Sequence, residues 1–136
     1  MADKRLSEAF KSIIARLDAN KPAALTGGVY YPNQAGWTQP ANKPWARLTI
    51  VPTVSTNVAV GGGAEWVRRN MLIVVDVFTP KESGINSNLA ICEDISDLFE
   101  NTEFGNVKTF EANTAKIEDD PWLGYQVTIN SYCEGY

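Results

Sequence analysis

The sequence predicts an α+β fold in which two α-helices pack on one face of a mostly antiparallel β-sheet. Two segments, residues 4–18 and 81–101, repeat apolar side chains at the spacing of amphipathic helices. Four others have the alternation or the β-branched composition of strands: residues 45–52, 67–80, 107–117 and 122–133. The order of these elements and the length of 136 residues fit a single domain, residues 1–136.

The first helix is expected to carry one apolar face, made of Leu6, Phe10, Ile13, Ile14 and Leu17. Its polar side is mixed in sign, which favours packing on a sheet over lying on a membrane surface. Pro22 ends the helix region, because proline cannot continue a helix and moves the residue before it out of the helical conformation. The loop that follows, residues 20–44, contains a short extended segment at Val29–Tyr31 and three aromatic side chains that we expect to be exposed: Tyr30, Tyr31 and Trp37.

The strand segments predict different patterns of burial. Residues 45–52 place Ala46, Leu48 and Ile50 on one side and Trp45, Arg47, Thr49 and Val51 on the other. Residues 67–80 contain an almost continuous apolar run, which predicts a central strand covered on both faces, or on one face by a neighbouring subunit. Residues 122–133 alternate, with one side formed by Tyr125, Val127, Ile129, Ser131 and Cys133.

The second helix is expected to bury one stripe and to expose an acidic side. The stripe is Ile85, Leu89, Cys92, Ile95 and Phe99, flanked by Ile91 and Leu98, and Ser83 or Ser87 is a candidate N-cap. The outer side carries Glu93, Asp94, Asp97 and Glu100. Because the sequence has no Lys or Arg between residues 82 and 107, these acids have no cationic partner on their own helix. Such a face is either solvated or docks a basic surface of another copy.

The stretch TVSTNVAVGGGAEWVRRN, residues 53–70, joins two predicted strands. Its three consecutive glycines do not open a helix, as the glycines of a phosphate-binding loop would. We interpret the stretch as a long β-hairpin arm in which the Val and Thr residues of 53–59 extend the ladder and the glycines let the tip bend. Alternation places Arg68 and Arg69 on opposite sides of the second strand.

Composition argues against catalysis. The chain has no histidine, which removes His-based catalytic and metal sites. Glu118-Asp119-Asp120 precedes a proline and is interpreted as a turn, and Ser7 with Lys11 has no sign of the buried lysine that a Ser-Lys dyad needs. The two cysteines, Cys92 and Cys133, are expected in the core. We expect no cofactor, no metal and no enzyme activity.

Charge is unevenly distributed along the chain. Residues 1–81 contain ten Lys/Arg and five Asp/Glu, whereas residues 82–136 contain two and eleven. Either folding mixes the two halves, or the basic surface of one copy meets the acidic surface of the next. The pI of about 4.8 disfavours nucleic acid as the main partner. Neither a membrane span nor a signal peptide is indicated, so a soluble protein made in a cytoplasm is expected.

The order of motifs resembles the tail-terminator family of long-tailed bacteriophages, also called minor tail or tail completion proteins. The resemblance rests on the N-terminal helix, the aromatic loop around Tyr30–Pro32, KPWARLTIVP (43–52), VDVFTPKESGIN (75–86), LAICEDISDLFEN (89–101) and DDPWLGYQVTINSY (119–132). It covers nearly the whole chain, and the family has no catalytic residue to carry over.

The resemblance implies a structural protein of the virion, located at the head-proximal end of the tail and assembled in the cytoplasm of the bacterial host. It implies a six-membered ring that caps the tail tube, stops its polymerisation and offers a surface to head-completion or connector proteins, with DNA passing through the lumen. We expect the arm to become ordered on a neighbouring subunit or on the tube protein. The expected interface residues are Val58, Val60, Gly61, Gly62, Gly63, Trp66, Arg68, Arg69, Glu93, Asp97 and Glu100.

Two alternatives remain open at this point. A head–tail connector or stopper protein would have the same size and also form a ring. A protein of another class, a small ligand-binding α+β domain or enzyme, would use the Tyr30, Tyr31 and Trp37 loop as its pocket.

Overall fold

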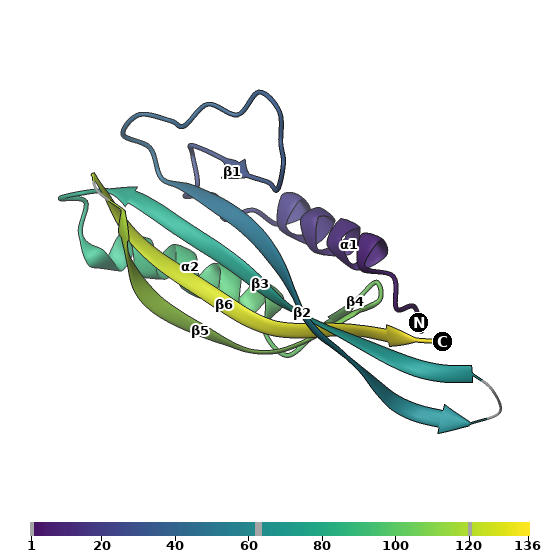
Figure 1. Ribbon diagram of the computed structural model, residues 1–136. Helices are drawn as coiled ribbons and strands as arrows, with labels where there is room; N and C mark the ends of the chain where they lie inside the picture. Colours follow the sequence, from purple (N-terminus) through teal and green to yellow (C-terminus); the bar gives the residue numbers. More distant parts are fainter. Residues whose placement is uncertain (1, 62–63, 120) are drawn as a thin grey trace.

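The computed structural model describes residues 2–61, 64–119 and 121–136, and it has the predicted α+β architecture (Figure 1). In chain order the elements are α1 (Leu6–Ala19), β1 (Val29–Tyr30), β2 (Trp45–Gly61), β3 (Ala64–Pro80), α2 (Ile85–Phe99), β4 (Glu103–Phe104), β5 (Val107–Asp119) and β6 (Trp122–Gly135). None of the helices in this described part is long and apolar enough to span a bilayer.

The strands form one six-stranded sheet in the order β1-β2-β3-β6-β5-β4. β1 runs parallel to β2, and the other neighbouring strands are antiparallel. β3 lies at the centre, paired with β2 on one side and with β6 on the other. This central place is where its apolar run was expected.

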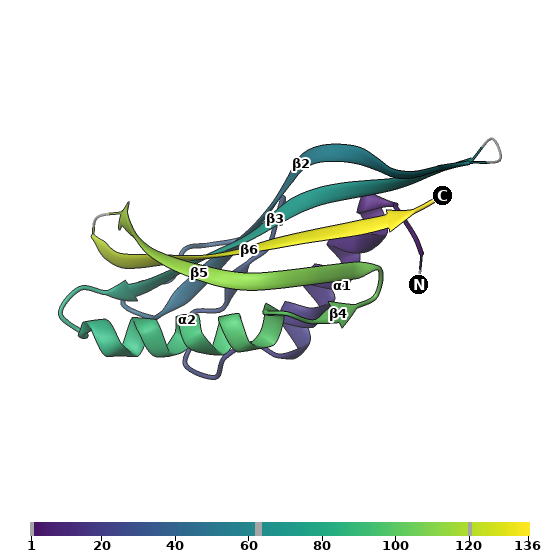
Figure 2. The ribbon, with the colours of Figure 1, turned by 90° about the horizontal axis from the view of Figure 1, so that it is seen from below.

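Both helices lie on the same side of the sheet, as predicted (Figure 2). Alternation along β3 turns Ile73 and Val75 toward the helices, and both side chains are fully buried. The core that they join is built from both helices and from β2, β3 and β6. Its fully buried members include Ile13, Leu17, Ala46, Leu48, Ile91, Ile95, Val127, Ile129 and Cys133.

The opposite face of the sheet has a smaller aromatic cluster, formed by Trp45, Phe78 and Trp122. Trp45 stacks on Phe78 with ring centroids 4.5 Å apart. Along the middle of β3 this face has no helix, and Leu72 and Val74 are half-buried there. The expected cover on both faces is therefore present only toward the Phe78 end of the strand within this chain.

The aromatic loop after α1 differs from the prediction. Tyr30, Tyr31 and Trp37 are half-buried rather than exposed. Trp37 stacks on Tyr30 and lies against Trp45, so the loop extends the aromatic cluster. The hydroxyl of Tyr31 donates to Asp18 Oδ1 over 3.0 Å, which ties the loop to the end of α1.

The start of α2 also differs from the prediction. Its N-cap is Gly84, at φ 88°, and neither serine caps the helix. Ser83 Oγ donates instead to the carbonyl of Pro80, and Ser87 Oγ to that of Gly84. Ile85, expected in the buried stripe, is 54% exposed because it opens the helix beyond the edge of the core.

Candidate functional site

The predicted hairpin arm is present, and its ladder extends past Pro52 as the composition of residues 53–59 predicted. β2 does not end at Pro52 but continues to Gly61, and β3 begins at Ala64, so the ladder runs almost to the tip. Two register irregularities, between Pro52 and Ser55 and between Asn57 and Ala59, interrupt it. The arm projects past the end of β6, as Figure 1 shows.

The predicted interface residues of the arm fall into three groups. Val58 is 44% exposed. Val60 and Gly61 occupy ladder positions opposite Glu65 and Ala64. Gly62 and Gly63 lie outside the described residues, so the predicted bending tip stays a prediction.

The two arginines of the arm point to opposite faces of β3, as alternation predicted, and both have partners within the chain. Arg68 Nε donates to Glu134 Oε2 over 2.8 Å, and its guanidinium lies 4.1 Å from the ring centroid of Tyr132. Arg69 Nη1 donates to Ser55 Oγ over 3.1 Å. The arginines therefore anchor the base of the arm to β6 and β2.

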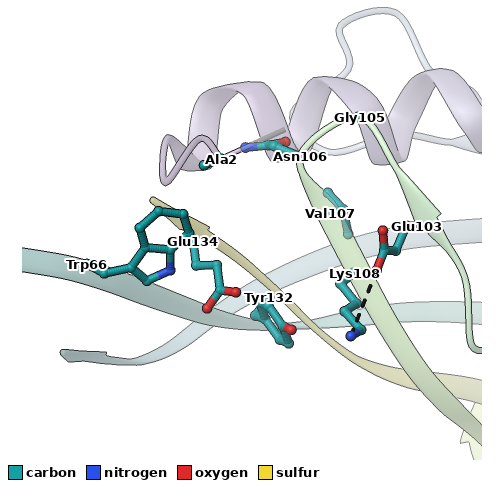
Figure 3. Close-up of a pocket in the computed structure, with 9 residues that line it drawn as sticks. All are labelled: Ala2, Trp66, Glu103, Gly105, Asn106, Val107, Lys108, Tyr132 and Glu134. Carbon is teal, nitrogen blue, oxygen red and sulfur yellow. Dashed lines mark ion pairs between the residues drawn. The ribbon is translucent and has the colours of Figure 1, made fainter. Parts of the chain in front are cut away.

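A cleft of about 300 Å3 lies at this base, between the start of the arm and the β4–β5 turn (Figure 3). Its polar walls come from four elements, and the ion pair of Lys108 Nζ with Glu103 Oε1, 3.8 Å long, lies along one side. Asn106 Nδ2 donates to the carbonyls of Asp3 and Arg5, which leaves the buried Oδ1 of Asn106 without a partner among the described residues. The lining residues are Ala2, Trp66, Glu103, Gly105, Asn106, Val107, Lys108, Tyr132 and Glu134.

Sequence reasoning placed Trp66 in the interface but missed this cleft. Trp66 meets the ring of Tyr136 edge-on at 4.8 Å, beyond the Arg68–Glu134 pair. Tyr132 and Glu134 belong to a strand that is distant from the arm in sequence, and pairing of β3 with β6 brings them together. The sequence indicates only that Tyr132 and Glu134 share a face of their strand with Asn130. Alternation does not show which strand lies beside that face.

Two of the three predicted interface residues of α2 lie exposed on its acidic side. Glu93 and Asp97 are exposed, as is Asp94, and these three side chains form no ion pair within the described residues. Glu100 is different, because its Oε2 accepts a hydrogen bond of 2.8 Å from the backbone N–H of Ala112 on β5. The acidic helix face therefore consists of Glu93, Asp94 and Asp97, while Glu100 has a structural contact within the chain.

A family model described as phage tail terminator protein matches residues 5–131.

The chain belongs to the phage tail terminator family.

A solved protein structure superposes with a TM-score of 0.64 over 98% of this chain and 98% of its own, at 17% sequence identity. At this identity the similarity concerns the fold alone. A comparison with curated proteins found no match.

Membership of the terminator family makes this a phage tail structural protein. No group of three or more potential metal ligands occurs among the described residues. Burial raises the pKa of the Cys92 thiol to about 12 and also raises that of Cys133, so both thiols stay protonated at neutral pH. The loop proposed as a ligand pocket instead packs its aromatic rings on Trp45, which removes the observation that favoured the ligand-binding alternative.

Proposed function

We propose that this member of the terminator family acts as a hexameric ring that caps the tail tube, stops its polymerisation and joins the tail to the head. Its partners would be further copies of itself, the tail tube protein and a head-completion or connector protein. The ring would sit at the head-proximal end of the virion tail, after assembly in the host cytoplasm.

The arm is the observation that supports this proposal best. Every side chain from Val51 to Val58 is exposed, and no residue from Leu48 to Ala64 is charged. Contact with another chain would stabilise such an arm, because that contact buries exposed apolar side chains and pairs the open strand edge. The acidic helix face of α2 offers a second, electrostatic contact of the kind that a basic surface on a neighbouring subunit complements.

The direct test mixes the purified protein with tail tubes of its own phage and views them by negative-stain electron microscopy, with light scattering to give mass. We expect six-fold rings or tube ends closed by one ring. A chain that stays monomeric at high concentration and never closes a tube end would contradict the proposal. A ring that binds the head connector but not the tube would favour the connector alternative.

Shortening the arm tests its part in assembly. We expect replacement of residues 58–64 by an Asn-Gly turn, which suits a two-residue hairpin, to leave the fold intact. Ring formation and tube capping should be lost, because the proposed contacts of the arm with other chains are removed, whereas the pairing of β3 with β6, which begins at Val67, is kept. Circular dichroism measures the fold and electron microscopy the capped ends. Loss of the folded state would instead make the arm part of the domain's own core.

A further inference from the structure

The outer edge of β2 is bare over most of the strand. β1 pairs only with Ala46 and Arg47, so from Thr49 onward no described strand lies beside β2 on that side. Figure 1 shows β2 continuing with β3 beyond the end of β6. Backbone N–H and C=O groups on such an edge are a template for pairing with another chain.

The composition of this edge lacks one usual protection against such pairing, which is charge. Edge strands commonly carry Lys or other charges that prevent unwanted pairing, but residues 49–61 have none. Pro52 and the two register irregularities interrupt the ladder, yet Val54 is 66% exposed and Val58 44%. A long, uncharged and β-branched edge promotes aggregation unless a partner strand covers it.

The opposite end of the same sheet has a second open edge, on β5. Its first part is covered by the segment after α2, since Ala112 N–H donates to Glu100 Oε2 and Asn101 N–H to the carbonyl of Phe110. The Ala112 N–H therefore points outward, and the register of β5 with β6 is continuous from Ala112 to Asp119. By the alternation of an antiparallel ladder, the N–H and C=O groups of Thr114, Lys116 and Glu118 point outward as well, where no described strand meets them.

We propose that the outer edge of β2 in one copy of this chain pairs, by strand addition, with the outer edge of β5 in the next copy. The proposal rests on the ring-forming function proposed above and names the contact that builds the ring. The two edges lie at opposite ends of one sheet, so the same contact repeats from copy to copy, and such a head-to-tail series closes when its rotation allows.

Charge does not oppose this pairing, and ring closure favours it over pairing of two identical edges. β5 carries Lys116 and Glu118 on its exposed part, whereas the β2 edge is uncharged, so no like charges meet when β2 lies beside β5. Pairing of β2 with a second β2 would stop at a dimer and leave both β5 edges open.

The first test blocks each edge separately. Val54→Lys adds a charge to the β2 edge, and Thr114→Pro removes an outward N–H from β5; both positions are exposed, so the melting temperature should change little. We expect each variant alone to lose rings and capped tube ends. Mixed together, the two should form heterodimers and nothing larger, because each retains one open edge. The matched control is Asn130→Lys, at an exposed position on an inner strand of the sheet, and it should assemble normally.

The second test uses cross-linking and does not depend on function. The native cysteines, Cys92 and Cys133, are buried, so cysteines introduced at Val54 and at Thr114, Lys116 or Glu118 would be the reactive ones. Under oxidation, at least one double variant should give a ladder of bands beyond the dimer. Each single-cysteine variant should give no band above the dimer.

The outcomes separate this proposal from the proposed function. Rings formed equally well by both edge variants, or Val54→Cys that cross-links mainly to itself or to the tube protein, would overturn the β2–β5 contact and leave the ring intact. If Asn130→Lys also failed to assemble, the loss of rings in the edge variants would not be specific to the edges, and the β2–β5 contact would lose its support. Absence of rings and capped ends from the unmodified protein would overturn the function and the contact together.

Discussion

At the scale of single residues, Asn88 shows how a buried polar side chain joins a helix to a sheet. It is fully buried in the face of α2 where the sequence predicted apolar residues. Its amide nitrogen donates to the carbonyls of Val77 and Leu123 and to the hydroxyl of Thr79. The amide oxygen accepts a hydrogen bond from the Cys92 thiol. Asn88 therefore connects α2 to β3 and to the strand beside it, β6.

Replacing Asn88 by Ala should lower the free energy of unfolding by about 1–3 kcal/mol, because buried carbonyls lose their donor. Urea denaturation monitored by circular dichroism measures this change. The matched control is Asn86→Ala on the exposed side of the same helix, which should change stability by less than about 0.5 kcal/mol. Equal effects of the two substitutions would show that the network around Asn88 adds nothing to stability.

Arg47 is a second residue whose role depends on the fold. Alternation predicted that it points away from the core, and it does, but it meets Asp76, whose side chain is almost fully buried. Two hydrogen bonds from the guanidinium reach Asp76 Oδ2, and Gln126 donates to Oδ1. Side chains from the two neighbouring strands, β2 and β6, thus satisfy one buried carboxylate on β3, which no spacing along the sequence indicates.

At the scale of elements, α2 has two functions on its two sides. Its inner side packs Ile91 and Ile95 into the core, and its outer side exposes the acidic helix face. Glu100 shares the acidic chemistry of that face but stabilises β5 through the Ala112 N–H. A substitution at Glu100 would therefore confuse a folding effect with an assembly effect.

The acidic helix face can be tested without that complication. Glu93→Lys combined with Asp97→Lys should leave the unfolding midpoint nearly unchanged, because both side chains are exposed and unpaired within the described residues. Ring formation should weaken if the face meets a basic surface of the next copy. Sedimentation of the protein alone and electron microscopy with tubes measure assembly. Glu82→Lys, an exposed acid outside the helix, is the control; normal assembly of the double variant would remove this contact.

The β2–β3 hairpin is an element for which two local signals disagree. Pro52 and the three glycines are typical of loops, whereas the valines and threonines of residues 53–59 predicted that the ladder extends past Pro52, and it does. Proline is tolerated on an edge strand where its missing N–H faces outward, and β2 is such a strand. The position of β2 within the sheet therefore overrides the local signal of Pro52.

At the scale of the whole molecule, the ion pairs recorded among the described residues fall mostly within one half of the chain. The Arg68–Glu134 pair joins the halves, whereas Arg5–Asp3, Arg47–Asp76 and Lys108–Glu103 each lie within one half. The separation of charge that remains is available to contacts between copies.

Assembly should accordingly weaken as salt rises. The Debye length falls from about 10 Å at 0.1 M salt to about 3 Å at 1 M, which screens contacts between exposed charges. Counting capped tube ends across this range measures the effect, with the integrity of the tubes alone as control. Assembly that is unchanged or stronger at 1 M salt would mean that apolar and backbone contacts along the arm dominate.

The sequence by itself determined both helices, the four long strands and their order, and most of the side chains that these elements bury, whereas the short strand β4 was not predicted. Local periodicity carries that information because burial on one side of an element imposes it. The family resemblance was also visible in the order of motifs, and the match over residues 5–131 confirms it. Tertiary structure alone decided that Asn88 is buried, that Glu100 has a partner and that Tyr30 and Trp37 pack on Trp45. It also decided which edges of the sheet stay open, because strand order and register depend on contacts between residues distant in the chain, and periodicity within one segment does not record them.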